Sequence, residues 1–479
     1  MCKFRHGISI KAYIISKFKR ASMGGFVLYY CFVICSLLLV LYGVGRFWVK
    51  PKRVERKLKQ QGIAGRPYKL LIGDVKEFVR LITEAWSKPI NLSHQIVQRV
   101  DPFTLDNVQK YRKISFCWAG TTPRLIIKDP ELMTQVLSNK QGHFQKPPLN
   151  PLILILTRGL TTLEGEDWAK HRRIINPSFH LEKLKVMIPE FATSCRNMIQ
   201  QWNQMIGSQE SCELDVWPQF QKLTADVISR AKNKRRRRLN TEITAMLRNV
   251  IEGKANALKT GKSRVDDLLG LLLQYCENEN ESSTRTIGLT IEEVIEECKA
   301  FYLAGQETTS SLLTWTVVVL AMHPDWQEKA RQEVYKLVTM ILYEVLRLYP
   351  PAIAQYQHTY KQTKIGEISV PAGVDIILPT LLVHHDPELW GNDVDEFKPG
   401  RFSEGVSKAS NNDQLAFFPF GWGPRSCIGQ NFAMLEAKLA LAMILPNFSF
   451  QLSPSYSHAP HTVMILQPQH GAQIILHKL

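Results

Sequence analysis

A loop of fourteen residues near the carboxyl end, FFPFGWGPRSCIGQ (417–430), constrains the fold of this chain more than any other stretch. Its glycines and prolines favour a loop, and it brings Cys427 to the start of a run with helical patterning that ends at Pro446. The amino terminus of a helix favours negative charge, so a thiolate is stabilised there. The glycines allow a flat macrocycle to approach the backbone, and Arg425 offers a cation beside it. The loop is therefore predicted to hold a thiolate against a plate-shaped ligand; the alternative is a buried structural cysteine.

The longest predicted helix begins at Thr290, which forms a T-x-x-E capping box with Glu293, and it stops at His323-Pro324. A helix between these signals has about 32 residues and a length of roughly 48 Å, enough to cross a whole domain. Its second half is apolar nearly all round. This pattern predicts a central buried helix.

The middle of this helix carries the sequence AGQETT, residues 304–309. Gly305 costs about 1 kcal/mol relative to alanine in a helix, and a threonine hydroxyl there can turn back onto the carbonyl four residues earlier. Glu307, a carboxylate in an apolar helix, is costly to bury unless it is partnered or used. These costs favour a functional segment; the alternative is a glycine for close packing and an acid at the edge of the domain.

Residues 21–45 carry no charge and are long enough to cross a bilayer as one helix. A segment rich in aromatic and basic residues, RFWVKPKRVERK, follows directly, and no small-residue cleavage site is present. We therefore predict a transmembrane anchor at residues 23–48, and not a cleaved signal peptide or a buried core helix. Basic residues flank both sides, so charge does not set the orientation. Our hypothesis is that translation starts at Met23, which would remove a basic extension, residues 1–22, and leave the carboxyl side cytoplasmic.

The rest of the chain is predicted to be a basic linker at residues 49–72 and one mainly α domain at residues 73–479. Short β-branched runs at residues 123–129 and 363–379 predict small β-sheets. The formal charge of +17 favours an anionic neighbour such as a membrane surface, an acidic protein or nucleic acid. Nine scattered cysteines without CxxC pairs argue against a disulfide scaffold or a zinc ribbon. Two adjacent histidines at residues 384–385 are interpreted as loop contacts, because adjacent histidines do not easily bind one ion.

The loop around Cys427 resembles the haem-binding loop of the cytochrome P-450 superfamily, F-x-x-G-x-R-x-C-x-G, at all five fixed positions: Phe420, Gly423, Arg425, Cys427 and Gly429. Further segments resemble that family in its order along the chain: WAKHR (168–172), AGQETT (304–309), EVLR (344–347) and FKPGRF (397–402). The sequences that flank these motifs are similar to those of plant members of the seventy-two clan of this superfamily. The resemblance covers residues 23–479.

The resemblance implies the P-450 fold, an α-rich domain with small β-sheets and haem b between the long helix and the Cys-loop helix. In that family the position of Cys427 ligates the iron, and those of Thr308 and Glu307 act in catalysis by hydrogen-bonding oxygen and delivering protons through water. A further set of positions contacts the cofactor: Trp168, Arg172, Ala304, Gly305, Phe420, Gly421, Arg425 and Gly429. Three others form a structural ion-pair network: Glu344, Arg347 and Arg401.

The resemblance also implies partners and a location. It predicts a monooxygenase that uses O2 and electrons from an NADPH–cytochrome reductase to oxidise a hydrophobic small molecule such as a terpenoid, a steroid or a hormone-like compound. Membrane lipid is an expected partner, with a single-pass anchor in the endoplasmic reticulum and a cytoplasmic catalytic domain. The run KNKRRRR (232–238) has nuclear-localisation or RNA-binding composition, but behind a membrane anchor we expect no nucleic acid.

The chain departs from the family pattern at four places. Near residue 230 relatives continue through helices that roof the substrate pocket, and near residue 335 they place a further helix and loop, so two internal deletions are predicted. Gly400 stands where relatives have glutamate, and His358 stands where they have arginine near a haem propionate. A missing roof exposes apolar surface to water. The alternative function is therefore a non-catalytic, membrane-anchored remnant, from an exon-skipped or misannotated gene model or from a decayed gene copy.

Overall fold

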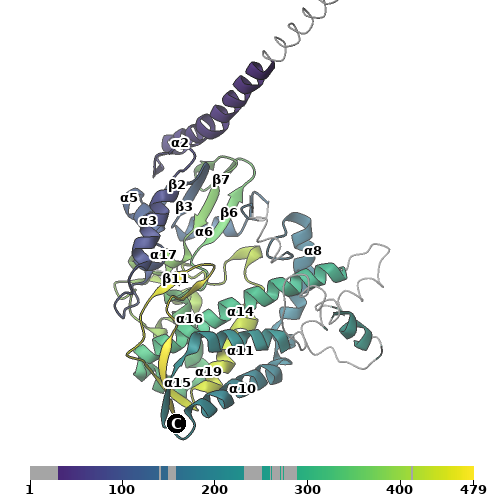
Figure 1. Ribbon diagram of the computed structural model, residues 1–479, viewed down its shortest axis with the longest axis vertical. Coiled ribbons are helices and arrows are strands. Elements are labelled where there is room, and N and C mark those ends of the chain that lie inside the picture. Colours follow the sequence, from purple (N-terminus) through teal and green to yellow (C-terminus); the bar gives the residue numbers. More distant parts are fainter. Residues whose placement is uncertain are drawn as a thin grey trace, which may run out of the picture.

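The computed structural model describes residues 31–139, 142–148, 158–230, 251–258, 260, 270, 273, 289–411 and 414–479. A single helix, Cys31–Gln60, projects from a body of helices and small sheets (Figure 1). Within the described residues it is the one helix long and apolar enough to cross a membrane, and its apolar part is not buried against the protein. The predicted basic extension, the start at Met23 and the first turns of the anchor lie outside the described residues.

The anchor helix is joined to the body without a break in helical structure. A π-helical turn, η1 (Gly45–Val49), leads into α2 (Lys50–Gln60). Pro51 has no N–H to donate to the carbonyl of Phe47, four residues earlier, and the hydroxyl of Tyr68 donates to that carbonyl at 2.6 Å. The predicted linker at residues 49–72 therefore begins as helix, and a side chain of the body bonds to the last turns of the anchor.

Glu55 strengthens this junction from the other side. Its side chain is 6% exposed and pairs with Lys52 at 2.8 Å and with Lys59 at 2.7 Å. Burial by itself raises the pKa of Glu55, but the two lysines and the N–H of Tyr68 outweigh it and lower the pKa. The indole of Trp48 lies 6.1 Å from the Tyr68 ring, and Lys52 lies over that indole.

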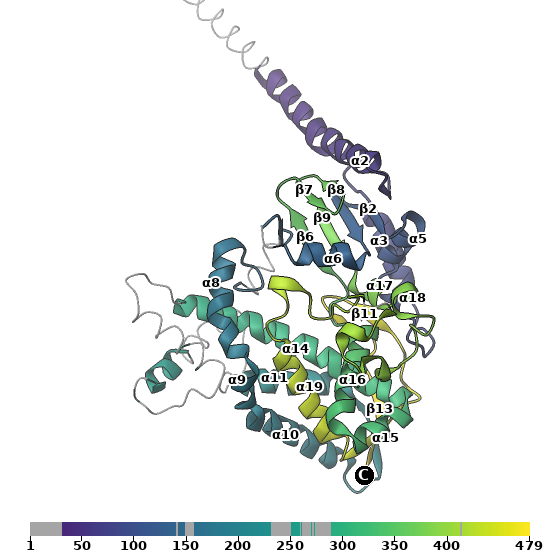
Figure 2. The ribbon, with the colours of Figure 1, turned by 180° about the vertical axis from the view of Figure 1, so that it is seen from behind.

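The six-stranded sheet and the β7–β8 pair lie beside the anchor, most of the helices lie beyond them, and β13 lies at the far end of the body next to α15 (Figures 1 and 2). The main sheet has six strands in the order β1-β2-β3-β9-β6-β4. Its strands are β1 (Ala64–Gly65), β2 (Ile114–Ala119), β3 (Thr122–Ile127), β4 (Phe144–Gln145), β6 (Gln355–Thr359) and β9 (Asp375–Leu378). Three short sheets contain β7 (Thr363–Ile365) with β8 (Ile368–Val370), β11 (Pro460–Thr462) with β12 (Leu466–Pro468), and β5 (Ser211–Asp215), β10 (Phe448–Leu452) and β13 (Gln473–Lys478). Strands form at both predicted segments, 123–129 and 363–379.

The long central helix is confirmed with both of its ends. Helix α14 (Ile291–Met322) has 32 residues; Thr290 and Glu293 form the capping box, and His323 ends it before Pro324. It packs against α11 (Val216–Arg230), α16 (Val334–Leu348) and α19 (Gln430–Ile444), while α10 (Ile188–Ile206) packs against α11 and α19. The second half of α14 is buried from Thr309 to Ala321, as its apolar composition predicts.

The remaining helices surround this group. They are α3 (Val75–Trp86), α4 (Val97–Val100), α5 (Pro102–Tyr111), α6 (Pro130–Leu137), α8 (Gly165–Ile175), η2 (Asn176–Phe179), α9 (Leu181–Lys185), α15 (Pro324–Gln332), α17 (Thr380–His384), α18 (Pro387–Trp390), η3 (Pro399–Phe402), η4 (Val406–Lys408) and η6 (Gly423–Arg425). Helix α16 begins two residues after α15 ends, so a single residue, Glu333, joins them. The fold is that of the predicted α-rich domain with small sheets.

Candidate active site

The loop before α19 has a closed backbone conformation around Cys427. The backbone N–H of Cys427 donates to the carbonyl of Phe420 at 2.8 Å, so the backbone at Cys427 lies next to the first part of the loop. Gly423 has φ +71°, and a Cβ there would lie 2.5 Å from the carbonyl oxygen of Leu137. The need for glycine at this position therefore comes from packing against α6, whereas the sequence suggested room for a ligand.

The side chain of Cys427 is accessible to solvent and borders a cavity of about 300 Å³. The cavity lies between the Cys loop, α8 and the segment that follows α8. Its lining residues are Arg172, Asn176, Phe179, His180, Leu181, Cys427, Ile428, Gln430 and Asn431. The predicted thiol therefore faces an open space beside a guanidinium group, and the alternative of a fully buried structural cysteine does not hold.

Burial raises the pKa of the Cys427 thiol, although the sulfur can still be reached by water. The backbone N–H groups of Gly429 and Gln430 and the charge of Arg172 act in the opposite direction and lower this pKa. The predicted effect of the helix amino terminus is thus present, with the expected sign, but it is smaller than desolvation. An additional positive centre next to the sulfur is needed to make the thiolate the dominant form at neutral pH.

Two predicted cofactor contacts, Trp168 and Arg425, lie together beside the loop. The guanidinium carbon of Arg425 lies 4.4 Å from the centroid of the Trp168 ring. Arg425 also donates to the carbonyl of Leu163 at 3.2 Å and pairs with Glu164. Arg172, one turn after Trp168 on α8, donates to the carbonyl of Ser426 at 2.9 Å. Residues from two distant segments therefore form one cationic cluster, and Arg172 of this cluster lines the same cavity as Cys427.

Sequence reasoning missed two residues beside this cluster, Glu164 and Lys146. Glu164 precedes α8 and pairs with Arg425. An acid at the start of a helix is already explained by the helix dipole, so the sequence alone does not indicate this ion pair. The ammonium of Lys146 donates to the carbonyls of Leu160 and Thr161. Burial, together with the charge of Arg425, lowers the pKa of Lys146 to about 8. No local pattern identifies this lysine.

The AGQETT segment lies in the middle of α14, where the helix changes from half-exposed to buried. Ala304 is exposed. The hydroxyl of Thr308 donates to the Ala304 carbonyl at 2.6 Å, as predicted from the spacing of four residues. A Cβ on Gly305 would lie 3.1 Å from Cδ1 of Ile228 on α11, so this glycine allows a close approach of the two helices, as the packing alternative proposed. Burial raises the pKa of Glu307, and a hydrogen bond with Gln221 lowers it by less.

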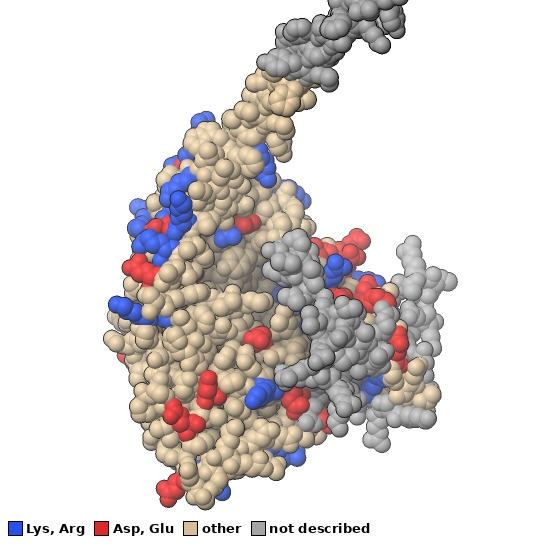
Figure 3. Space-filling model, viewed as in Figure 1, with Lys and Arg blue, Asp and Glu red and all other residues tan. Residues whose placement is uncertain are grey.

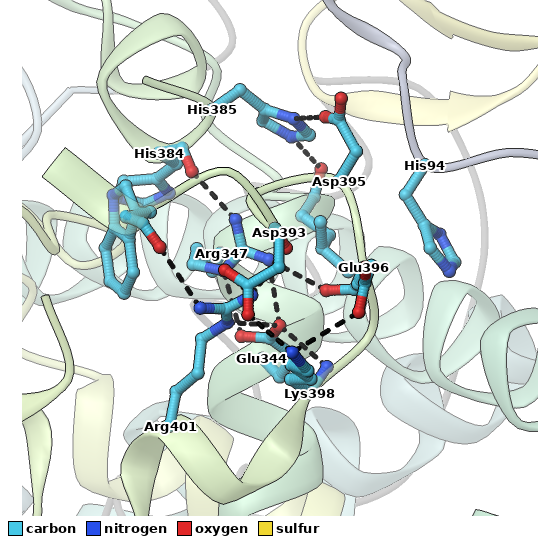
Figure 4. Close-up of polar contacts among 12 residues, drawn as sticks. His94, Glu344, Arg347, His384, His385, Asp393, Asp395, Glu396, Lys398 and Arg401 are labelled. Carbon is cyan, nitrogen blue, oxygen red and sulfur yellow. Dashed lines mark hydrogen bonds and ion pairs between the residues drawn. The ribbon is translucent and has the colours of Figure 1, made fainter. Parts of the chain in front are cut away.

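The three predicted ion-pair residues form a buried network at the end of α16 (Figure 4). Glu344 and Arg347 are fully buried, and the guanidinium of Arg347 donates to both carboxylate oxygens, at 2.9 and 2.8 Å. Nε of Arg401 lies 3.4 Å from the same carboxylate, and Arg401 also pairs with Asp393 at 2.8 Å. The two remaining donor contacts of Arg347 are to the carbonyls of His384 and Glu396. Two guanidinium groups thus neutralise one buried carboxylate.

The two substitutions noted in the sequence are accommodated locally. His358 lies 2.6 Å from Asp375 through its Nδ1 atom, in the six-stranded sheet. Gly400 lies in η3, and a Cβ there would meet nothing within 4 Å. The described residues contain no group of three or more His, Cys, Asp or Glu side chains that could hold a metal ion on their own.

A helix-rich fold with an accessible thiol at the start of α19, a cationic cluster beside it and a buried ion-pair network behind it defines a thiol-centred site. The profile of the cytochrome P-450 family matches residues 88–232 and 230–476. The chain belongs to the cytochrome P-450 family, whose members are haem-dependent monooxygenases that take electrons from a redox partner and act on hydrophobic substrates.

Plant proteins of this family are similar to the chain over most of its length. Cytochrome P-450 CYP72A616 from Paris polyphylla is 50% identical over 491 residues, which cover 90% of this chain and 95% of that protein. An 11-oxo-beta-amyrin 30-oxidase from Glycyrrhiza uralensis is 46% identical over 501 residues, with coverage of 92% and 95%. Because 90% of 479 residues is about 431, about 60 of the 491 aligned positions have no counterpart in this chain.

The residues present fit the haem group that the family carries. Cys427 supplies a solvent-accessible sulfur, the ligand type that holds haem iron as a thiolate. Arg172 and Arg425 supply guanidinium groups, which bind carboxylates with two parallel hydrogen bonds, and the Trp168 indole provides a further N–H donor. Arg172 and Cys427 line the same cavity, which places one of these cations beside the proposed iron ligand.

Proposed function

We propose that this chain is a haem-thiolate monooxygenase that oxidises a hydrophobic small molecule with O2. The observation that carries the proposal is the position of Cys427. Its sulfur is accessible to solvent, accepts hydrogen bonds from the backbone N–H groups of Gly429 and Gln430, and lies beside Arg172. A structural cysteine needs none of these features, whereas a thiolate ligand needs all of them.

The proposed cofactor is haem b, held by Cys427 through its iron and by Trp168, Arg172 and Arg425 through its carboxylates. When bound, haem would supply oxygen activation, and Cys427 as a thiolate ligand would donate electron density that favours cleavage of the O–O bond. Phe420, Gly421 and Gly429 belong to the loop segment expected to face the ring. The proposed role of Glu344, Arg347 and Arg401 is to hold this loop in place, without taking part in the chemistry.

Thr308 and Glu307, in the middle of α14, are the proposed proton-transfer pair. The hydroxyl of Thr308 is held by the Ala304 carbonyl and still has a lone pair to accept a hydrogen bond. Because burial raises the pKa of Glu307, this carboxyl keeps a proton at higher pH than an exposed glutamate and can donate it through water. Ala304 and Gly305 are the proposed small residues beside the reacting atoms.

The proposed substrate is a terpenoid, steroid-like or hormone-like compound. Two relatives are named 11-oxo-beta-amyrin 30-oxidase, which supports a triterpenoid-like molecule. The proposed electron donor is an NADPH–cytochrome reductase, because the sequence has no convincing nicotinamide or flavin motif. No role in binding nucleic acid is proposed.

The proposed location is the endoplasmic reticulum membrane, with one span and the catalytic domain in the cytoplasm. Lys and Arg side chains gather on the surface beside the anchor helix, where anionic lipid would attract them (Figure 3). Apolar side chains of the same region are more than 40% exposed: Leu70, Leu71, Ile72, Val75, Phe78 and Val79. Protease treatment of sealed microsomes tests this topology, since a cytoplasmic domain is digested and a lumenal one is protected.

The optical difference spectrum of the reduced, carbon-monoxide-treated protein tests the function. We expect a thiolate-type Soret band from microsomes that contain the full chain. The variant Cys427→Ser is expected to lose this band, because a hydroxyl cannot replace the sulfur ligand. A wild-type protein that binds no haem, or a serine variant with the same band, would refute the proposal.

A second function, that of a non-catalytic membrane-anchored remnant, is supported by a separate observation. About 60 aligned positions of the Paris polyphylla relative have no counterpart here, and the family profile matches in two parts that meet near residue 230. The direct joint of α15 to α16 and the exposure of Ala304 agree with deletions near residues 230 and 335. Sequencing of the transcript across Arg230 and Val334 tests the deletions, and a wild-type chain without a thiolate-type band would favour the remnant.

A further inference from the structure

His384 lies between the buried ion-pair network and the Cys loop, and it contacts both. It is the last residue of α17 and is fully buried. Its backbone carbonyl accepts a hydrogen bond from Arg347 at 2.9 Å (Figure 4). The Nε2 atom of its ring accepts a hydrogen bond from the backbone N–H of Phe418, also at 2.9 Å.

The ring must be neutral, with its hydrogen on Nδ1, to make this contact. Burial lowers the pKa of His384 to about 3, and the charges of Arg347 and His385 act in the same direction. The Phe418 N–H donates, so Nε2 carries the lone pair. Nδ1 therefore carries the hydrogen and makes no hydrogen bond of ordinary geometry, while the Leu346 and Arg347 backbone acts against burial and raises the pKa by less.

Packing holds the ring in this orientation. Phe417 stacks on the imidazole at 5.3 Å with an interplanar angle of 22°, and Trp390 meets it edge-on at 6.4 Å. Phe418 is buried, so its N–H cannot turn to bulk water if His384 is removed. Two residues later, the carbonyl of Phe420 accepts the N–H of Cys427. The contact therefore fixes the part of the loop to which the backbone N–H of Cys427 is hydrogen-bonded.

We propose that His384 is a positioning residue that transmits the geometry of the Glu344–Arg347–Arg401 network to the loop of Cys427. The network holds the carbonyl of His384, and the imidazole of the same residue holds the loop. The effect of this contact on the thiolate ligand rests on the proposed haem-thiolate function. The contact itself can be tested without cofactor.

A matched control is present in the neighbouring residue. His385 is also buried at the end of the same helix; its Nε2 donates to the Leu348 carbonyl at 3.0 Å and its Nδ1 faces Asp395 at 3.4 Å. Its ring makes polar contacts with α16 and with the segment before Phe397, and these contacts do not include the Cys loop. Loss of the His385 ring thus removes buried hydrogen bonds without removing the link to Phe418.

The experiment compares the full-length variants His384→Leu, His384→Gln and His385→Leu. Amide hydrogen exchange of Phe418 and Cys427 is measured first, because it needs no cofactor. His384→Leu is expected to raise the exchange of both amides by about tenfold, since a buried N–H loses its acceptor. His384→Gln is expected to restore protection, because its Oε1 can accept at the position of Nε2, and His385→Leu is expected to leave these two amides protected.

The reduced carbon-monoxide spectrum is the second readout. His384→Leu is expected to shift most of the haem from the thiolate-type to the neutral-thiol type band, while His384→Gln and His385→Leu keep the wild-type ratio. Unchanged exchange in His384→Leu, or a glutamine variant that exchanges as fast as the leucine variant, would overturn the proposal. If His384→Leu does not fold, protection in His384→Gln still supports the link, and its loss refutes it. A wild-type chain without a thiolate-type band would refute the proposed function but not the contact. In that case the amide exchange data would still decide whether His384 positions the loop.

Discussion

The guanidinium of Arg425 lies over the indole ring of Trp168, 4.4 Å from the ring centroid, although the two residues belong to opposite halves of the chain. The contact brings α8 against the Cys loop and places two carboxylate-binding donors side by side. A cation on an aromatic face contributes about 0.5–2 kcal/mol, more when it is shielded from water. The pair therefore both joins two segments and shapes the site.

Replacement of Trp168 by alanine is expected to weaken haem retention by about tenfold, because the indole N–H and the support of Arg425 are lost together. Trp326→Ala is the matched control, since Trp326 also carries a cation, Lys329, at 4.7 Å. Haem transfer to an acceptor globin measures retention in both variants. Equal retention in the two variants would show that the Trp168 contact has no role in the site.

Replacement of Glu344 by glutamine leaves Arg347 and Arg401 without their shared carboxylate. Breaking one side of a buried ion pair costs about 3–5 kcal/mol, because the remaining charge is desolvated and uncompensated. The exposed pair of Lys329 and Asp325, 3.5 Å apart, is the control, and Asp325→Asn is expected to cost at most about 1 kcal/mol. Urea unfolding followed by circular dichroism gives both values; similar costs for the two variants would contradict the prediction.

The stability of the chain is expected to depend on pH through His171. Burial lowers the pKa of His171, but hydrogen bonds and charges from Glu297 and Glu293 outweigh burial and raise the pKa above its ordinary value of 6.5. A raised folded-state pKa means that this stabilisation is complete below about pH 6.5 and is lost as the pH rises through the folded value.

The variant His171→Gln is therefore expected to be less stable than the wild type by about 2 kcal/mol at pH 6, the worth of a charge-assisted hydrogen bond, and by clearly less at pH 9. The exposed His180 provides the control, with no expected effect of His180→Gln at either pH. Thermal unfolding at the two pH values measures the difference. A cost that stays constant with pH would show that the imidazole does not carry the charge.

Glu307 is expected to destabilise the protein at neutral pH. Its folded-state pKa is raised by burial, so ionisation costs folding free energy, and stability falls as the pH rises through the unfolded value toward the folded one. Glu307→Gln should unfold at a higher temperature than the wild type at pH 7 and at the same temperature near pH 4. Glu292→Gln, at the amino end of the same helix, is the control. A glutamine variant without this gain at pH 7 would contradict the assigned burial.

Features with a local cause were predictable from the sequence. The ends of α14 follow from Thr290, Glu293 and Pro324, which lie within the helix or next to it, and the back-bond of Thr308 follows from the spacing of four residues. The Cys loop and the ion-pair residues were predictable by resemblance, because their spacing is rare.

Contacts between distant segments were not predictable. The pairing of Glu164 with Arg425, the acceptor role of His384 and the approach of Leu137 to Gly423 each join residues far apart in sequence, and no periodic pattern encodes them. The direction of the pKa shift of the Cys427 thiol was also not predictable. The helix terminus, which lowers this pKa, can be predicted from the sequence, whereas desolvation, which raises it, depends on the surrounding atoms.

The bond from Tyr68 to the carbonyl freed by Pro51 has a consequence for the intact membrane. Because the last turns of the membrane helix are bonded to the body, a change in the tilt of this helix would also change the orientation of the body. Such a helix is less tilted in a thicker bilayer and more tilted in a thinner one. The thickness of the bilayer would therefore set the height and the orientation of the Cys427 site above the membrane, without a conformational change in the body.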